Sequence, residues 1–329
     1  MGREAVSEVG MTDKQWRVAE IPVQTGRRVL ITGANSGIGY YAALELARKG
    51  AHVLMGCRSE ARGAAALERL RAQVPDASVE MVLLDLASLD SVKSFAEEEL
   101  AHGVGLDLLI NNAGVMAPKQ RLETRDGFEL QFGTNVLGHF VLTALLLPAL
   151  ERAAAVDEPR TRVVTIASIA HKQGRVNFED LQSEKSYSPM GAYRQSKLAD
   201  LMFAKELDRR LQRAGERLSR VMSVAAHPVV ANTNLFQAGE YPPMELRVRR
   251  WLGVAIGALL NTEAGGAVPT LFAATAPEVK RGGYYGPRGF QETRGGDVGP
   301  AMVAPQAQDW EAAARLWNEC ERLTGISLL

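Results

Sequence analysis

Thr32-Gly33-Ala34-Asn35-Ser36-Gly37-Ile38-Gly39 is the stretch that decides the fold of this chain. It follows the β-branched run 28–32 and opens a helical pattern that stops at Gly50. Glycines here let the backbone turn sharply and approach a pyrophosphate, which the free N–H groups and positive dipole end of the following helix attract. The spacing differs from the Gly-x-Gly-x-x-Gly of other dinucleotide folds, and a chance turn would have the same composition. The position between strand and helix favours a dinucleotide site lined by Gly33, Asn35, Ser36, Gly37, Ile38 and Gly39.

Short β-branched runs alternate with longer helical patterns along the rest of the chain. Strands are predicted over 28–32, 52–56, 79–84, 106–110, 163–167, 221–225 and about 283–286, and helices over 40–49, 128–147, 193–211 and 309–323. The alternation is typical of α/β proteins. We therefore predict a single Rossmann-type, doubly wound parallel sheet of about seven strands with helices on both faces. The Gly- and Pro-rich residues 287–305 are predicted to form a surface loop.

The composition excludes several classes of function. Lysine plus arginine number 38 and aspartate plus glutamate also 38, which argues against nucleic acid as a partner. Cys57, Cys320 and the five histidines show neither disulfide nor metal spacing, so no metal site is expected. No signal pattern opens the chain, and the apolar stretch 251–260 is about half of the ~20 residues that a bilayer span needs. These observations predict a cytoplasmic protein without a transmembrane segment.

The residues after the second predicted strand indicate which dinucleotide binds. NAD binders place a carboxylate there for the ribose 2′-hydroxyl, but this chain has Gly56-Cys57-Arg58-Ser59. The planar fork of Arg58 can pair with a 2′-phosphate, so NADP(H) is the predicted cofactor. The alternative is that Arg58 is a solvated residue at a helix start. Asp85 and Leu86, after the third strand, are predicted to flank the adenine, although Asp85 could also cap a helix.

A second group of residues suits proton transfer. Tyr193 and Lys197 stand four apart on one face of a predicted helix. A free tyrosine has a pKa of about 10, and a nearby ammonium favours its phenolate. Such a pair can donate and accept a proton near neutral pH. Ser168 ends a strand, at the rim where open α/β sheets bind ligands, and Asn135 lies in the long helix before it.

These motifs, together with Asn111-Asn112-Ala113-Gly114, come in the order and spacing of the short-chain dehydrogenase/reductase family. The chain resembles that family over about residues 25–325. The interval between Ser168 and Tyr193, with Ala170-His171 and 176–181, resembles the retinol-dehydrogenase-like branch. That branch also includes WW-domain oxidoreductase and protochlorophyllide-reductase-like enzymes, and no WW domain is present here.

The resemblance implies a role for each matching residue. Tyr193 would be the general acid in carbonyl reduction or the base in alcohol oxidation, and Lys197 would favour its ionisation and hold the nicotinamide ribose. Ser168 would bind the substrate oxygen, and Asn135 would position a water in a proton relay. Taken alone, Ser168 could be a turn serine and Asn135 a polar contact within a helix. The residues expected to line the cofactor after the fourth strand are Asn111, Asn112, Ala113 and Gly114.

One position departs from the family. After the sixth predicted strand the family usually has Pro-Gly, but this chain has His227-Pro228-Val229. Valine adds bulk beside the nicotinamide and disfavours positive φ. The resemblance places Pro228 and Thr233 at the cofactor, Thr233 at the carboxamide. The alternative to an enzyme is therefore a catalytically impaired, NADP(H)-binding regulatory protein. A nucleotide-sugar epimerase shares the Tyr/Lys pair but usually has another glycine spacing and a larger substrate domain.

The domain organisation follows from these assignments. We expect an N-terminal extension over 1–24, loosely docked, and one NADP-binding catalytic domain over 25–329 with a substrate-loop insertion at about 234–266. In the insertion, 245–260 is arginine-rich and then apolar, which favours a lid over an apolar pocket; a helix on a membrane surface and an ordinary packed helix are the alternatives. The expected substrate is a hydrophobic small carbonyl or alcohol. The resemblance implies a homodimer or homotetramer through the helices near 128–150 and Tyr193.

Overall fold

The run 28–32 forms the strand from which the sheet extends in both directions. The computed structural model describes residues 15–154, 161–228, 262–289, 292 and 297–329. The strands are β1 (Arg28–Thr32), β2 (His52–Cys57), β3 (Val79–Leu83), β4 (Leu108–Asn111), β5 (Arg162–Ile166), β6 (Met222–Ala226), β7 (Tyr284–Pro287) and β8 (Val298–Pro300). Their order across the sheet is β3-β2-β1-β4-β5-β6-β7-β8. The predicted doubly wound parallel sheet is confirmed, with an eighth strand, β8, that pairs antiparallel to β7.

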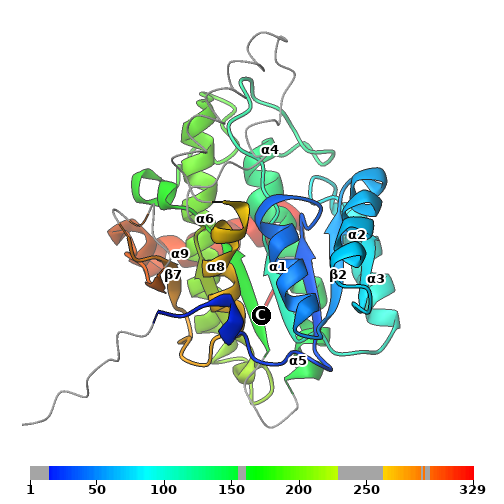
Figure 1. Cartoon of the computed structure of the whole chain (residues 1–329). Coiled ribbons are helices and arrows are strands. Elements are labelled where there is room, and N and C mark those ends of the chain that lie inside the picture. The colour runs from blue at the N-terminus through cyan, green and yellow to red at the C-terminus, as the bar shows by residue number, and fades with distance from the viewer. Residues whose placement is uncertain (1–14, 155–160, 229–261, 290–291, 293–296) are drawn as a thin grey trace, which may run out of the picture.

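Helices cover both faces of the sheet (Figure 1). The α-helices are α1 (Gly37–Arg48), α2 (Glu60–Gln73), α3 (Leu89–Ala101), α4 (Leu130–Phe132), α5 (Gly138–Ala153), α6 (Pro189–Leu211), α8 (Glu263–Thr275) and α9 (Trp310–Thr324). Shorter helical turns are η1 (Val18–Glu20), η2 (Gly133–Leu137), η3 (Ile169–Gln173), η4 (Leu218–Arg220) and η7 (Pro305–Gln308).

Two apolar cores lie on opposite faces of the sheet because successive strand residues point to opposite sides. Leu30 and Leu109 point into the core beneath α3, α5 and α6, whereas Ile31 and Ile110 point into the core beneath α1, α2 and α8. Strands covered on both faces read as continuous apolar runs, which is why their sequence pattern was recognisable.

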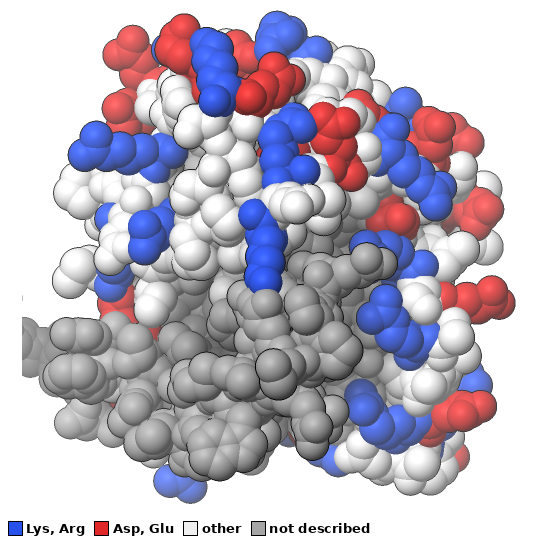
Figure 2. All heavy atoms as spheres, turned by 90° about the horizontal axis from the view of Figure 1, so that it is seen from above, with Lys and Arg blue, Asp and Glu red and all other residues white. Residues whose placement is uncertain are grey.

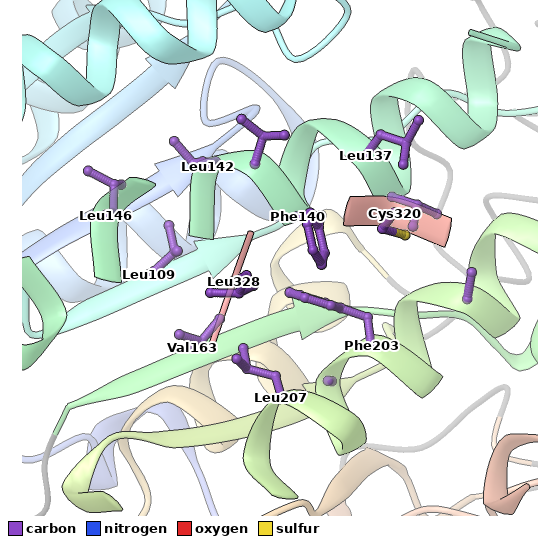
Figure 3. Packing of buried hydrophobic residues seen from close by; sticks show 14 of the residues in the cluster. Leu109, Leu137, Phe140, Leu142, Leu146, Val163, Phe203, Leu207, Cys320 and Leu328 are labelled. Atoms are coloured by element: carbon purple, nitrogen blue, oxygen red, sulfur yellow. The ribbon is translucent and has the colours of Figure 1, made fainter. Parts of the chain in front are cut away.

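Helix α9 closes the first core from outside α5 and α6. The Trp317 ring stacks on Phe203 of α6 with centroids 5.8 Å apart and meets Phe140 of α5 edge-on at 5.3 Å. Figure 3 shows Phe140 and Phe203 pointing toward one another, with Cys320 of α9 beside Phe140. A subunit contact was predicted through α5 and α6, and α9 of the same chain covers part of that surface. The homo-oligomer stays a prediction.

Three segments differ from their predicted form. Trp16 is buried and packs edge-on against Phe272 at 5.4 Å, so residues 15–21 are docked on the domain rather than loosely attached. Thr262 caps α8, so 263–266 belong to that helix and not to the insertion, whose residues 234–261 lie outside the described part. The predicted loop 287–305 contains β8, because the backbone of its Val298 and Pro300 pairs with β7.

Candidate functional site

The glycine-rich loop after β1 packs directly on the loop after β4. Gly33 and Gly37 have φ of 69° and 56°, which favours glycine. A Cβ on Gly39 would lie 2.5 Å from Asn112 Nδ2 and 2.6 Å from the Gly33 carbonyl oxygen, and one on Gly33 would lie 3.0 Å from Ala113 Cα. The strand order reverses between β1 and β4, and open α/β sheets bind ligands at that point.

Thr32 at the end of β1 fixes these two loops to each other. Its Oγ1 accepts the backbone N–H groups of Asn112 and Ala113, both at 2.9 Å, and Asn112 Nδ2 donates to its carbonyl at 2.7 Å. The same hydroxyl lies 2.9 Å from Nε2 of His139, whose Nδ1 lies 2.8 Å from the carbonyl oxygen of Asn135. A carbonyl only accepts, so Nδ1 carries the proton and Nε2 accepts from Thr32. Sequence analysis did not select His139. The one indication in the sequence is that His139 lies one helical turn after Asn135.

The start of α1 is left open. Ser36 makes no side-chain cap, whereas Ser59, Ser88 and Ser188 accept the capping N–H groups of α2, α3 and α6. Asn35 Nδ2 instead contacts the Ser36 hydroxyl at 3.5 Å. The first turn of α1 therefore presents its N–H groups and positive dipole end at the switch point, which suits an anion such as a pyrophosphate. Ile38 is partly buried against the second core.

The residues predicted near the adenosine end follow β2 and β3. Arg58 is exposed directly after β2 and just before the cap of α2. Asp85 Oδ1 accepts the N–H of Ala87 at 3.0 Å, and Ser88 caps α3, so the alternative of Asp85 as helix cap is wrong. Leu86 is buried under the start of α5.

Asn135 lies on a π-helical turn, η2, between α4 and α5. Turns of this kind occur frequently at functional sites. The side chain of Asn135 is fully buried and joins two elements. Its Oδ1 accepts from the Val115 N–H at 2.8 Å, and its Nδ2 donates to the Val115 carbonyl at 3.1 Å and to Ser196 Oγ at 3.0 Å. The side chain thereby ties the loop after β4 to the residue beside Lys197.

Tyr193 and Lys197 are both nearly buried on α6, which begins four residues earlier than predicted because Ser188 caps it and Pro189 follows. Lys197 Nζ donates to the Ile166 carbonyl and to Asp200 Oδ2, each at 2.8 Å. Burial lowers the pKa of Lys197, but the charge of Asp200 and that of Tyr193 outweigh it and raise this pKa above its usual value. At Asp200 burial outweighs the attraction of Lys197 and raises the pKa to about 6.

Several of the predicted residues meet around Lys197. A Cβ on Gly114 would lie 3.4 Å from Asn135 Oδ1 and 3.8 Å from Lys197 Nζ. Ile166, which accepts from Lys197, ends β5 two residues before Ser168. The ends of β4 and β5, the π-helical turn and α6 thus converge near Lys197.

Ser168 opens η3 directly after β5. Its Oγ accepts the N–H of Ala170 at 3.2 Å, so it is a turn serine as well as a candidate site residue. The ring of His171 holds the Ser168 carbonyl through Nδ1 at 2.7 Å, and its Nε2 accepts from the Ala304 N–H at 3.2 Å. Burial lowers the pKa of His171, which keeps the ring neutral and able to make both bonds. Sequence analysis quoted His171 only as a mark of the branch.

The segment after β6 is described only as far as Pro228, so Val229 and Thr233 lie outside the described residues. His227 is fully buried, and burial lowers its pKa to about 4. Its ring lies 5.2 Å from that of Tyr284, centroid to centroid, and occupies the space beside Gly286.

The described site residues lie in loops after the carboxyl ends of strands or on helices; those on helices are Gly37, Ile38, Gly39, Asn135, Tyr193 and Lys197. Figure 2 views the molecule from above, on the side where these ends lie in Figure 1, and shows basic and acidic side chains intermingled around the visible rim.

The comparisons with known proteins agree with this geometry. The family model described as short chain dehydrogenase matches residues 27–240. Retinol dehydrogenase 14 of Homo sapiens is 38% identical over 316 residues, which cover 92% of this chain and 87% of that protein. Polyprenol dehydrogenase of Mus musculus is 41% identical over 312 residues, which cover 94% of this chain and 87% of that protein.

Solved structures give the same result. A protein of unassigned function from Mycobacterium Paratuberculosis has a TM-score of 0.76 at 40% identity, over 96% of this chain and 100% of that chain. A protein from Beutenbergia cavernae, assigned as an NAD(P) dependent gluconate 5-dehydrogenase and crystallised with NADP at low occupancy, has a TM-score of 0.56 at 27% identity. That match covers 77% of this chain and 92% of that chain.

The comparisons overturn the predicted cytoplasmic location. The relatives are named for retinol and polyprenol, which are lipid alcohols that reside in membranes rather than in the aqueous cytoplasm. Among the described residues one helix, Leu130–Ala153, is long and apolar enough to cross a membrane by length and composition. Its apolar window is 78% buried inside the fold, and core helices pass the same test, so the helix adds little to this correction.

Proposed function

Since the chain belongs to the short chain dehydrogenase family, we propose that it transfers a hydride between NADP(H) and the carbonyl or alcohol of a hydrophobic small molecule. Membership makes it an oxidoreductase with a nicotinamide cofactor. The observation that carries the proposal is the nearly buried pair Tyr193 and Lys197, held at the sheet edge where the glycine-rich loop lies.

The residues present fit a dinucleotide. The uncapped start of α1 would receive the pyrophosphate, and no Cβ fits at Gly39 against Asn112. Arg58, exposed after β2, would pair with the 2′-phosphate through its planar fork. The nicotinamide, when bound, supplies or accepts the hydride.

Tyr193 would handle the proton. It would donate one to the substrate oxygen in carbonyl reduction and remove one in alcohol oxidation. The Lys197 ammonium has three N–H donors, of which the Ile166 carbonyl and Asp200 take two among the described residues. The third would be left for the nicotinamide ribose or a water held near Asn135.

Ser168 would orient the substrate oxygen. Its Oγ accepts one N–H, from Ala170, and its own O–H remains to be donated. A donor fixed in advance stabilises the oxyanion that develops on the substrate. The hydrogen bonds of His171 hold the backbone of Ser168 in this orientation.

The hydrophobic substrate is inferred from the relatives' names, retinol dehydrogenase and polyprenol dehydrogenase. The same names argue against the regulatory protein without turnover. Reduction of aldehydes and oxidation of alcohols are the two directions of one reaction, so both are assayed.

The test is cofactor turnover over a panel of apolar and charged aldehydes, ketones and alcohols. We expect turnover of apolar members, and its loss in Tyr193→Phe with cofactor binding retained.

Arg58→Ala is expected to weaken NADPH binding about tenfold or more and leave NADH binding unchanged, since a charge-assisted hydrogen bond is lost. Arg71→Ala, at the far end of α2, is the matched control. Equal affinity of the unmodified protein for NADH and NADPH would refute the NADP preference, and turnover of charged ketones alone would refute the apolar substrate.

A further inference from the structure

We propose that Asp200 is a positioning residue, which keeps Lys197 charged and in place and thereby sets the pH range in which Tyr193 acts. This inference rests on the proposed function, in which Tyr193 transfers the proton. No family motif used in the sequence analysis includes Asp200, and the proposed reaction assigns it no step.

The geometry is that of a buried ion pair. Lys197 Nζ and Asp200 Oδ2 are 2.8 Å apart, and their side chains are 6% and 3% exposed. The residues are three apart on α6, so the helix itself presents the carboxylate to the ammonium. The Ile166 carbonyl receives a second hydrogen bond, and the two acceptors together fix where Nζ lies.

The pair has a physical purpose because a lone ammonium is costly in a protein interior. Burial favours the neutral amine, and a carbonyl oxygen alone does not compensate the charge. The carboxylate of Asp200 does, and the pKa of Lys197 lies above its usual value despite the burial. Without that charge, Lys197 would give up its proton more readily.

The other titratable groups that face this pair carry no charge. His139 of α5 lies near Lys197, and burial lowers its pKa to about 3. Cys320 of α9 lies near Asp200, and burial raises the pKa of its thiol far above the usual value. Tyr193 is the remaining group on α6 that interacts with Lys197. Tyr284 of β7 also interacts with Tyr193, but burial raises its pKa well above the usual value, so it too is neutral. Of the groups named here, Lys197 and Asp200 are the charged ones.

The negative charge of Asp200 opposes the loss of a proton by both Lys197 and Tyr193. Its negative charge holds the proton on Lys197, and the same charge weakens the pull of the ammonium on the Tyr193 phenolate. Removal of the charge makes the phenolate form at lower pH and makes Lys197 lose its proton at lower pH. Both limbs of a bell-shaped pH profile then move toward acid, which loss of structure alone would not produce.

The experiment is the pH dependence of kcat/KM for alcohol oxidation by the full chain with NADP⁺. In Asp200→Asn, which keeps the shape, we expect both limbs to move toward acid by about one pH unit, the usual effect of one nearby charge. In Asp200→Glu, which keeps the charge, we expect both limbs to lie where they lie in the unmodified protein. If Asp200→Asn does not fold, Asp200→Ser removes the charge and retains an acceptor for Lys197.

The control is Asp208→Asn on the same helix. Asp208 is also buried, but it accepts from the Ser223 N–H at 3.0 Å and pairs with Arg281 at 3.1 Å, away from Lys197. It is expected to lower stability without moving either limb. Limbs that stay in place in Asp200→Asn, with activity lowered evenly at every pH, overturn the inference. Turnover that survives Tyr193→Phe overturns the proposed function itself, so the two failures are distinguishable.

Discussion

Thr32→Val is the substitution that tests most directly how the two loops of the candidate site are held. Valine has nearly the shape of threonine and suits a strand, so packing in β1 is preserved. What is lost is the hydroxyl that accepts from the N–H groups of Asn112 and Ala113 and donates to Nε2 of His139. Thr32 is 1% exposed, so water cannot replace that hydroxyl without a rearrangement.

The magnitude follows from the number of groups left without a partner. A buried donor or acceptor that loses its partner costs about 1–3 kcal/mol. The Ala113 N–H and the Nε2 of His139 lose theirs, whereas the Asn112 N–H keeps the Ile110 carbonyl at 3.0 Å. Two such groups, less what relaxation of the loops recovers, lead us to expect that Thr32→Val lowers the free energy of unfolding by about 2–5 kcal/mol. NADPH binding should also weaken, because the loop after β4 loses part of its anchor.

The assay is urea unfolding beside a matched control on β5, which is separated from β1 by β4. Thr165 of β5 is also 1% exposed, but its Oγ1 has no hydrogen-bond partner among the described residues. Thr165→Val should therefore be neutral or stabilising, because it removes an unsatisfied hydroxyl. If the two variants unfold with free energies within about 0.5 kcal/mol of each other, the inferred role of Thr32 is refuted.

Three further outcomes are expected. Gly39→Ala should weaken NADPH binding about tenfold, measured by cofactor fluorescence titration, because the added carbon would lie 2.5 Å from Asn112 Nδ2. Trp317→Ala should lower the free energy of unfolding by about 3–5 kcal/mol through the cavity that it leaves, and a loss below about 1 kcal/mol would contradict the packing of α9. Burial lowers the pKa of His227 from 6.5 to about 4, so the stability that it contributes is complete above pH 6.5 and is lost as the pH falls through 4. His227→Gln should flatten that fall in denaturation curves recorded between these pH values, and an unchanged slope would contradict the buried neutral ring.

The sequence predicts β1 residue for residue and most other strands to within two, because parallel strands covered on both faces are continuous apolar runs. Strand β8 is different. Val298-Gly299-Pro300 has no strand pattern, and it is extended only because β7 offers its edge. The docking of Trp16 on Phe272 likewise depends on a helix about 250 residues later in the chain, which no local pattern reports.

Some residues of the candidate site could likewise be predicted from local sequence, and others could not. Tyr193 and Lys197, the glycine-rich loop and Arg58 follow from spacing within one element or at one strand end, and the structure places each there. Asp200 stands three residues after Lys197 on the same helix, so local spacing could have indicated this pair. His139 could not be found in this way, because its contact with Thr32 depends on how α5 and β1 face one another. The register between elements is a property of packing, and local spacing carries no record of it.

The covering of Phe140 and Phe203 by Trp317 has a consequence for the chain as it is made. Helix α9 leaves the ribosome about 100 residues after α6, which at about 5–20 residues per second leaves these rings uncovered for roughly 5–20 s. During that interval the half-made protein presents an aromatic surface that chaperones or neighbouring nascent chains can bind. Yield on overexpression should therefore depend on the speed of synthesis and on chaperone supply, more than the stability of the finished protein would suggest.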